Sequence, residues 1–145
     1  MKRHPALHPL SHDHHQGLII AQQLKKGAPR YKGMPSTLEE KKNYTVSFYN
    51  NELKSHFKEE EEILFPLAKN RTPELDIMIN EIVDEHRKME KLVNEIEKTT
   101  DLKNVLDSLG WLLEKHIRKE ERKLFPAIEE ILTEEELSEL KTKLK

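Results

Sequence analysis

A short pattern of histidine and glutamate occurs twice in the sequence, and its residue types could bind a metal ion. Residues 56–66 match residues 116–126 at an offset of 60, with histidine, two adjacent glutamates, leucine, phenylalanine and proline in the same places. In each copy a histidine precedes a glutamate by four residues, as in the pairs His56 and Glu60, and His116 and Glu120. Residues at this spacing share one face of a helix. Each copy therefore presents an imidazole and a carboxylate together.

A second pair of histidines follows the same twofold arrangement. Asp13-His14 aligns with Glu85-His86 at an offset of 72, and this register also superimposes the apolar residues that follow in the two segments. The register favours His14 over the adjacent His15, which is the alternative because the apolar pattern is short. Each half of the chain thus contributes one histidine, followed later by a His-x-x-x-Glu pair.

Both His-x-x-x-Glu pairs lie on the apolar stripe of their predicted helices. Burying a charged carboxylate without a compensating charge costs roughly several kcal/mol, unless the pKa of the group rises so far that it becomes neutral. No lysine or arginine falls on these stripes at the same depth, so a metal cation is the favoured partner. Two alternatives are a duplicated bundle whose histidines are hydrogen-bonded core residues, and a histidine-phosphotransfer bundle with one exposed reactive histidine.

The candidate ligands are four imidazoles and two carboxylates, which suffice for two divalent ions with the glutamates free to bridge them. Mixed nitrogen and oxygen ligation of this kind suits iron first, with manganese or zinc possible. The chain has no cysteine, which excludes disulfides, thiolate zinc sites, iron–sulfur clusters and cysteine nucleophiles. The order His-x-x-x-Glu also differs from the Glu-x-x-His order of ferritin-like sites.

These residues require helices to position them, and the rest of the sequence predicts an all-α fold. Glycines number 4 and prolines 7, and apolar residues recur at spacings of three and four. We expect helices over about residues 11–26, 36–67, 73–98, 102–131 and 133–144. Pro66 is expected to bend or end the second of them. The arrangement predicts one up-down-up-down four-helix bundle over residues 1–145, made of helix pairs 10–69 and 73–131, with a short fifth helix.

Composition limits the partners of such a domain. The formal charge is -2 and the pI is near 6.5, so no strong attraction to nucleic acid or to anionic lipid is expected. No stretch is apolar enough for a signal peptide or a membrane span, which makes the cytoplasm the expected location. We expect a monomer or a homodimer, with apolar residues of the fifth helix as a possible dimer surface, and core positions for Phe48, Tyr44, Tyr49 and Trp111.

Taken together, these motifs resemble the hemerythrin-like (HHE cation-binding) domain family. The resemblance runs from Leu10 to about Ile131 and rests on Asp13-His14, Glu85-His86 and the two His-x-x-x-Glu-Glu-x-x-Leu-Phe-Pro segments. It implies a four-helix bundle that holds two non-heme iron ions, bridged by an oxo or hydroxo group and two carboxylates. The ligands that it implies are His14, His56, Glu60, His86, His116 and Glu120.

One position departs from the oxygen-carrying members of that family. They place a further histidine four residues after the one in the third helix, where this chain has Glu90. Glu90 is a candidate ligand, an acceptor for an imidazole N–H group, or a surface residue. His12 is a further candidate for a fifth ligand. An additional carboxylate ligand would stabilise ferric iron, and this would disfavour the reversible binding of dioxygen.

The resemblance implies a non-heme di-iron protein that binds, senses or stores dioxygen, nitric oxide or iron, with a diatomic gas or peroxide as its small-molecule partner. The alternative is a di-iron oxidoreductase, or a nitric-oxide-linked protein that repairs iron centres. Relatives of the repair type often carry a cysteine in an N-terminal segment, and this chain has none. The sequence favours a binding protein over an enzyme, without deciding the question.

Overall fold

The computed structural model describes residues 3–29, 33 and 35–144, and the described part contains helices and turns but no strand. Its α-helices are α1 (His8–Leu24), α2 (Leu38–Phe48), α3 (Lys54–Glu59), α4 (Phe65–Ala68), α5 (Pro73–Ile96), α6 (Leu102–Lys119), α7 (Phe125–Ile131) and α8 (Glu134–Lys143). A 3-10 turn, η1 (Pro5–Leu7), precedes α1, and three π-helical turns are η2 (Tyr49–Leu53), η3 (Glu60–Leu64) and η4 (Glu120–Leu124).

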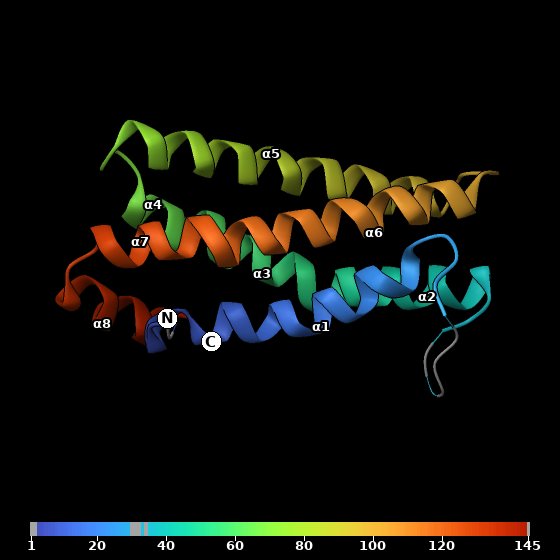
Figure 1. The fold of residues 1–145 in the computed structure, drawn as a ribbon, viewed down its shortest axis with the longest axis horizontal. Coiled ribbons are helices and arrows are strands. Elements are labelled where there is room, and N and C mark those ends of the chain that lie inside the picture. The colour runs from blue at the N-terminus through green and yellow to red at the C-terminus, as the bar shows by residue number, and fades with distance from the viewer. Residues whose placement is uncertain (1–2, 30–32, 34, 145) are drawn as a thin grey trace.

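The helices form a bundle of four rods, because the π turns join several of them end to end. One rod runs from α2 through η2, α3 and η3 to α4, and another runs from α6 through η4 to α7. Helices α1 and α5 are the other two rods, and both pack against α6 (Figure 1). The short α8 folds back beside η1 at one end (Figure 1). The predicted all-α bundle with a short fifth helix is confirmed.

Side chains at the helix starts explain where the rods begin. Thr37 accepts a hydrogen bond from the backbone of Glu40, whose side chain accepts one in return, and this capping box opens α2. Thr133 opens α8 with a second capping box. Thr72 caps α5, and Pro73 occupies its first turn, where the missing N–H group costs no hydrogen bond.

Two predicted helix boundaries can be compared with the structure. Helix α1 begins at His8, where a start near Ser11 or slightly before is expected, and it ends at Leu24. Pro66 does not end its helix, which continues to Ala68. Pro66 lies directly after the π turn η3, in the first turn of α4, where a proline is tolerated.

The π turns follow the internal repeat, with one exception. Turns η3 and η4 each begin at a repeated glutamate, Glu60 or Glu120, so both halves share this local geometry. Turn η2 has no counterpart in α6, which is regular through the matching residues. A π turn takes up one extra residue. Accordingly, the buried Thr45 and Phe48 match the buried Leu106 and Leu109 at an offset of 61 rather than 60.

The apolar core consists of two clusters along the length of the bundle. One cluster includes Leu10, Leu64, Ile82 and Leu124, together with the buried leucines of α8. The other includes Ile20, Phe57, Met89 and Leu113. Along the four rods, His14, Glu60, His86 and Glu120 lie between residues of the two clusters, and His56 and His116 lie one turn before Glu60 and Glu120. A buried polar layer therefore lies between two apolar layers of the bundle.

The structure corrects the expected core position of Trp111 and shows where the apolar residues of α8 lie. Trp111 is 57% exposed rather than buried, and the Nζ atom of Lys25 lies 3.8 Å from the centre of its ring. Leu137 and Leu140 of α8 are buried in the core of their own chain, because α8 packs on η1. The apolar face expected to support a dimer is thus already covered.

No helix among the described residues is both long enough and apolar enough to span a bilayer.

The close approach of α1 and α6 requires a glycine. A Cβ atom on Gly110 would lie 2.7 Å from the backbone oxygen of Ala21 and 3.1 Å from Cβ of Leu24. We expect Gly110→Ala to lower the free energy of unfolding by about 1–3 kcal/mol through overpacking, as measured by urea denaturation. The control is Ser108→Ala on the exposed face of α6, which should be neutral or slightly stabilising. Equal stabilities of the two variants would contradict the close packing.

Candidate metal centre

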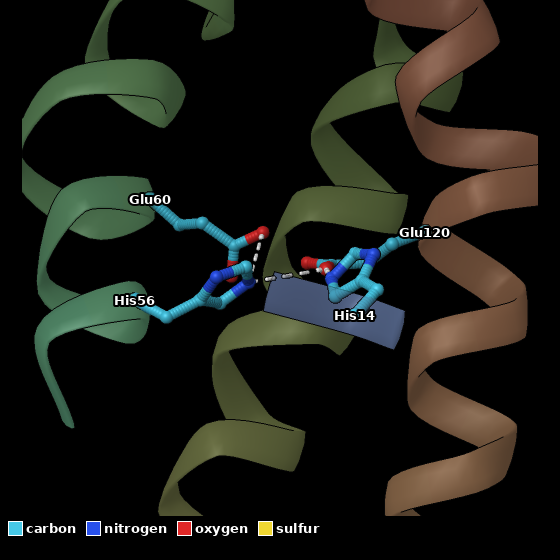
Figure 2. A group of neighbouring side chains, drawn as sticks. All are labelled: His14, His56, Glu60 and Glu120. Carbon is cyan, nitrogen blue, oxygen red and sulfur yellow. Dashed lines mark ion pairs between the residues drawn. The ribbon is translucent and has the colours of Figure 1, made fainter. Parts of the chain in front are cut away.

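The polar layer brings together all six residues that the sequence proposed as ligands. The exposed fractions are 5% for His14, 2% for His56, 1% for His116, and 0% for Glu60, His86 and Glu120. Figure 2 shows His56 and Glu60 on one helix, facing His14 and Glu120 from two others. His86 comes from α5 and His116 from α6, so all four rods contribute.

The six residues form two groups that share both glutamates. His14 and His56 lie with Glu60 and Glu120 in the first group, and His86 and His116 lie with the same glutamates in the second. In each group the candidate ligand atoms are within 4.8 Å of one another. The histidines of one group come from one half of the chain. The arrangement suits two neighbouring cations, each held by two imidazoles and both held by two shared carboxylates.

The inward-facing atoms lack hydrogen-bond partners within the described part of the chain. Nε2 of all four histidines and both oxygens of each central glutamate are buried without a partner in hydrogen-bond geometry. Nε2 of His14 lies 2.7 Å from Oε1 of Glu120, and Nε2 of His86 lies 3.1 Å from Oε1 of Glu60. Each unsatisfied buried polar group costs about 1–3 kcal/mol. Cations between these atoms would satisfy all of them, so the residues present fit a metal centre.

The outward-facing nitrogen of each histidine contacts a second carboxylate. These Nδ1 contacts are His14 with Glu121 at 2.6 Å, His56 with Asp13 at 3.0 Å, His86 with Glu61 at 2.7 Å and His116 with Glu85 at 2.7 Å. Since an ionised carboxylate only accepts, Nδ1 carries the proton and donates. The lone pair of a neutral ring is then on Nε2, directed at the shared glutamates, as a metal ligand requires.

The outer carboxylates repeat with the chain and link its two halves. Asp13 and Glu85 each precede the first histidine of their half and contact the second histidine of the same half. Glu61 and Glu121 instead contact the first histidine of the opposite half. The repetition of Glu61 and Glu121 is visible in the sequence and suggested an outer shell. The role of Asp13 and Glu85 was missed, although both are acids immediately before an aligned histidine.

Cations adjoin three of these four outer carboxylates. Arg87 pairs with Glu61, Lys119 Nζ lies 2.6 Å from Glu85, and Arg3 lies 3.3 Å from Glu121. Among the described residues, no lysine or arginine lies within ion-pair distance of Asp13. The negative charge of the outer carboxylate is therefore less neutralised at His56, which contacts Asp13, than at the other three histidines.

Burial shifts the pKa values of the central groups in opposite directions. Burial and repulsion by Glu120 hold the pKa of Glu60 well above its usual value. Burial also acts to raise the pKa of Glu120, but the attraction of His116 and contacts with neighbouring groups hold that pKa well below its usual value. Without a metal, the pKa values of the two central glutamates are thus driven apart.

Burial and the neighbouring charges also shift the pKa values of His14 and His86. Burial opposes protonation of His14, but contacts with Glu120 and Glu121 outweigh it and raise the pKa of His14 to about 9. Burial and the charge of His116 lower the pKa of His86 to about 2. The raised pKa of His14 thus favours a positive charge beside Glu120, where a metal cation would balance the buried charge.

The other three candidates lie outside both groups. His12 and His15 are exposed on α1. Glu90 is half-buried, and its Oε1 lies 2.7 Å from Arg87, which also pairs with Glu61. Of the three possibilities considered for Glu90, this position fits a residue at the edge of the outer shell.

A model of the Hemerythrin HHE cation binding domain family matches residues 8–128, which is most of the chain. The match overlaps nearly all of the segment in which the sequence motifs resemble that family. No curated protein and no solved structure matches the chain.

The proton balance predicts an unusual pH dependence for the metal-free chain. The pKa of His14 is about 9 when folded against 6.5 when unfolded, so its stabilising contribution is complete below pH 6.5 and is lost toward pH 9. We expect a loss of about 1–3 kcal/mol over this window in the presence of a chelator, measured by urea denaturation. The metal-loaded chain should behave oppositely, because metal ions bind deprotonated imidazoles. Parallel pH profiles would contradict this reading.

The outer carboxylates should tune metal affinity. Glu85→Gln keeps an acceptor of similar size for His116 but removes the charge, so we expect metal affinity to fall about 10-fold in a chelator competition assay. The matched control is Glu81→Gln, an exposed position one turn earlier on α5. Unchanged affinity in Glu85→Gln, or an equal loss in the control, would show that the contact with His116 does not act on the metal.

Proposed function

The chain belongs to the hemerythrin HHE cation-binding domain family, and on that premise we propose that it holds two iron ions and binds a diatomic gas, dioxygen or nitric oxide, beside them. The observation that carries the proposal is the convergence of four unpartnered imidazole nitrogens and four unpartnered carboxylate oxygens in the middle of the bundle. Buried polar atoms of this number are rarely left unsatisfied in proteins.

The donor set supports iron over other cations. Each group offers two imidazole nitrogens and oxygens of two shared carboxylates, with no thiolate. Such mixed nitrogen and oxygen ligation is typical of non-heme iron, whereas soft thiolates would favour zinc or copper(I). Bound iron would supply redox chemistry and coordination positions at which a small molecule can bind. Manganese and zinc are the other ions to be tested.

The protein's own residues prepare the site before any metal binds. Each imidazole is held by an Nδ1–H group that donates to an outer carboxylate, which fixes the ring orientation and keeps Nε2 inward. Phe125 stacks on His14, and Phe57 stacks on His86, so apolar rings cover the imidazole faces. The surroundings thereby limit access of water to the centre.

The space beside the site supports a very small ligand. A void of about 10 Å³ adjoins His14 and His56, and its other walls include Gly17, Leu53 and Ile117. This volume is about the minimum that holds one water molecule. It suits a diatomic molecule and excludes most organic substrates, which favours gas binding over the oxidation of a larger compound.

The proposal is tested by metal analysis of protein purified without a histidine tag, followed by anaerobic titration of the iron-loaded protein with nitric oxide and then with dioxygen. We expect about two irons per chain and a change in the absorption spectrum at one equivalent of gas or less. Purified chain that takes up no iron anaerobically would overturn the proposal. Steady consumption of nitric oxide or peroxide would assign the oxidoreductase role instead.

Removing one imidazole from each group should affect the two positions separately. His56 and His116 belong to different groups, so we expect His56→Ala and His116→Ala each to lower the iron content by about one ion per chain. Mass spectrometry of the metal content checks this, with His15→Ala on the exposed face of α1 as the control. Full iron content in both ligand variants would disprove the assignment.

A further inference from the structure

The two candidate metal positions have different surroundings, although their ligands repeat. At the offsets of the repeat, Gly17 matches Met89, and Ile117 matches Phe57. Met89 is fully buried, and the ring of Phe57 stacks on His86 with centroids 3.9 Å apart. The large ring of Phe57 thus packs against both histidines of the second position. The smaller Gly17 and Ile117 adjoin the void beside His14 and His56.

This void adjoins a larger pocket at the surface. The outer pocket has a volume of about 400 Å³ between α1 and the rod of α2 and η2. Asp13, Phe48 and Glu52 line both the outer pocket and the void. The remaining walls of the outer pocket are mainly polar and include His12, Gln16 and Asn51. The polar outer pocket therefore lies next to the void beside the imidazoles of the first position, and the exposed lining of that void is mainly apolar. Together they form a candidate path to these imidazoles.

Glu52 lies on this path, and the second half of the chain has no carboxylate at the matching position. Glu52 precedes His56 by four residues, just as His56 precedes Glu60, so three polar side chains follow one another at this spacing along the rod. The second half has Leu112 at the matching position. Glu52 also lies in η2, the π turn that has no counterpart in α6. Within the described residues, the carboxylate of Glu52 and the additional π turn therefore occur together, beside the void.

The charge along the path favours a cation. Asp13 contacts Nδ1 of His56, and no lysine or arginine within the described residues pairs with it. Further in, His14 and His56 are 5% and 2% exposed, and the Nε2 atoms of both lack hydrogen-bond partners. The carboxylates of Asp13 and Glu52 thus lie at the outer end of the path, and the buried Nε2 atoms of His14 and His56 lie at its inner end.

We propose that the pocket bounded by Asp13 and Glu52 is the loading site of the metal centre, through which a divalent cation reaches the His14 and His56 position. This inference rests on the proposed function, because it requires the centre to bind metal. Oxygen ligands from Glu52 and Asp13 replace waters of the hydrated ion before it passes the narrow void. The volume of the void, about 10 Å³, requires most of the hydration shell to be lost there.

The test measures the rate at which metal-free, full-length chain takes up ferrous iron under anaerobic conditions, by stopped-flow absorption. Glu52 is exposed and lies outside both ligand groups, so Glu52→Gln should fold normally and reach the same final iron content. We expect its uptake rate to fall about 5-fold at low ionic strength, and that of Glu52→Lys to fall further. The difference from the unmodified chain should shrink with added salt.

The matched control is Glu62→Gln, which removes an exposed carboxylate from the same rod beside a pocket on the His86 side. Its uptake rate should be unchanged. Equal rates in Glu52→Gln and the unmodified chain would overturn the loading site, as would equal slowing in Glu62→Gln. A lower final iron content in Glu52→Gln would make Glu52 a ligand rather than part of a path. Absence of iron uptake by the unmodified chain would instead defeat the proposed function itself.

Discussion

The structure depends on the burial of two carboxylates, Glu60 and Glu120, halfway along a helical bundle. Removing a carboxylate from water is costly unless opposite charge or hydrogen bonds replace the hydration. Four imidazoles surround this pair, and their inward nitrogens are equally unsatisfied. Cations meet both requirements at once. Without metal, burial and the neighbouring carboxylates raise the pKa values of Glu60 and His14, which favours their protonated forms.

The outer carboxylates make the centre a property of the whole bundle. Asp13 and Glu85 connect the two rods within each half, whereas Glu61 and Glu121 connect rods of opposite halves. Arginine and lysine side chains on the surface complete three of these connections. Because every imidazole is held from outside, its orientation is set by packing and charge before metal binds. The two apolar clusters on either side of the polar layer hold the rods at this separation.

Departures from the internal repeat are as informative as the repeat itself. Repeated ligands form two positions of the same composition, but Gly17 against Met89 and Ile117 against Phe57 make their surroundings unequal. The additional π turn η2 places Glu52 at the mouth of the void on one side only. Family membership explains what the two positions share. The differences lie in the residues around the two positions, and they support the proposal that metal arrives from one side.

The sequence alone determined the helical class and proposed the six residues of the centre, because a helix converts a spacing of four residues into a shared face. It also separated His14 from His15 through the register of the repeat. Other features depended on distances between rods, which no local pattern encodes. These are the pairing of Asp13 with His56 and of Glu85 with His116, and the packing of α8 on its own chain. The void beside His14 likewise exists only because α1, α6 and η2 meet there, and tertiary packing alone decides such a meeting.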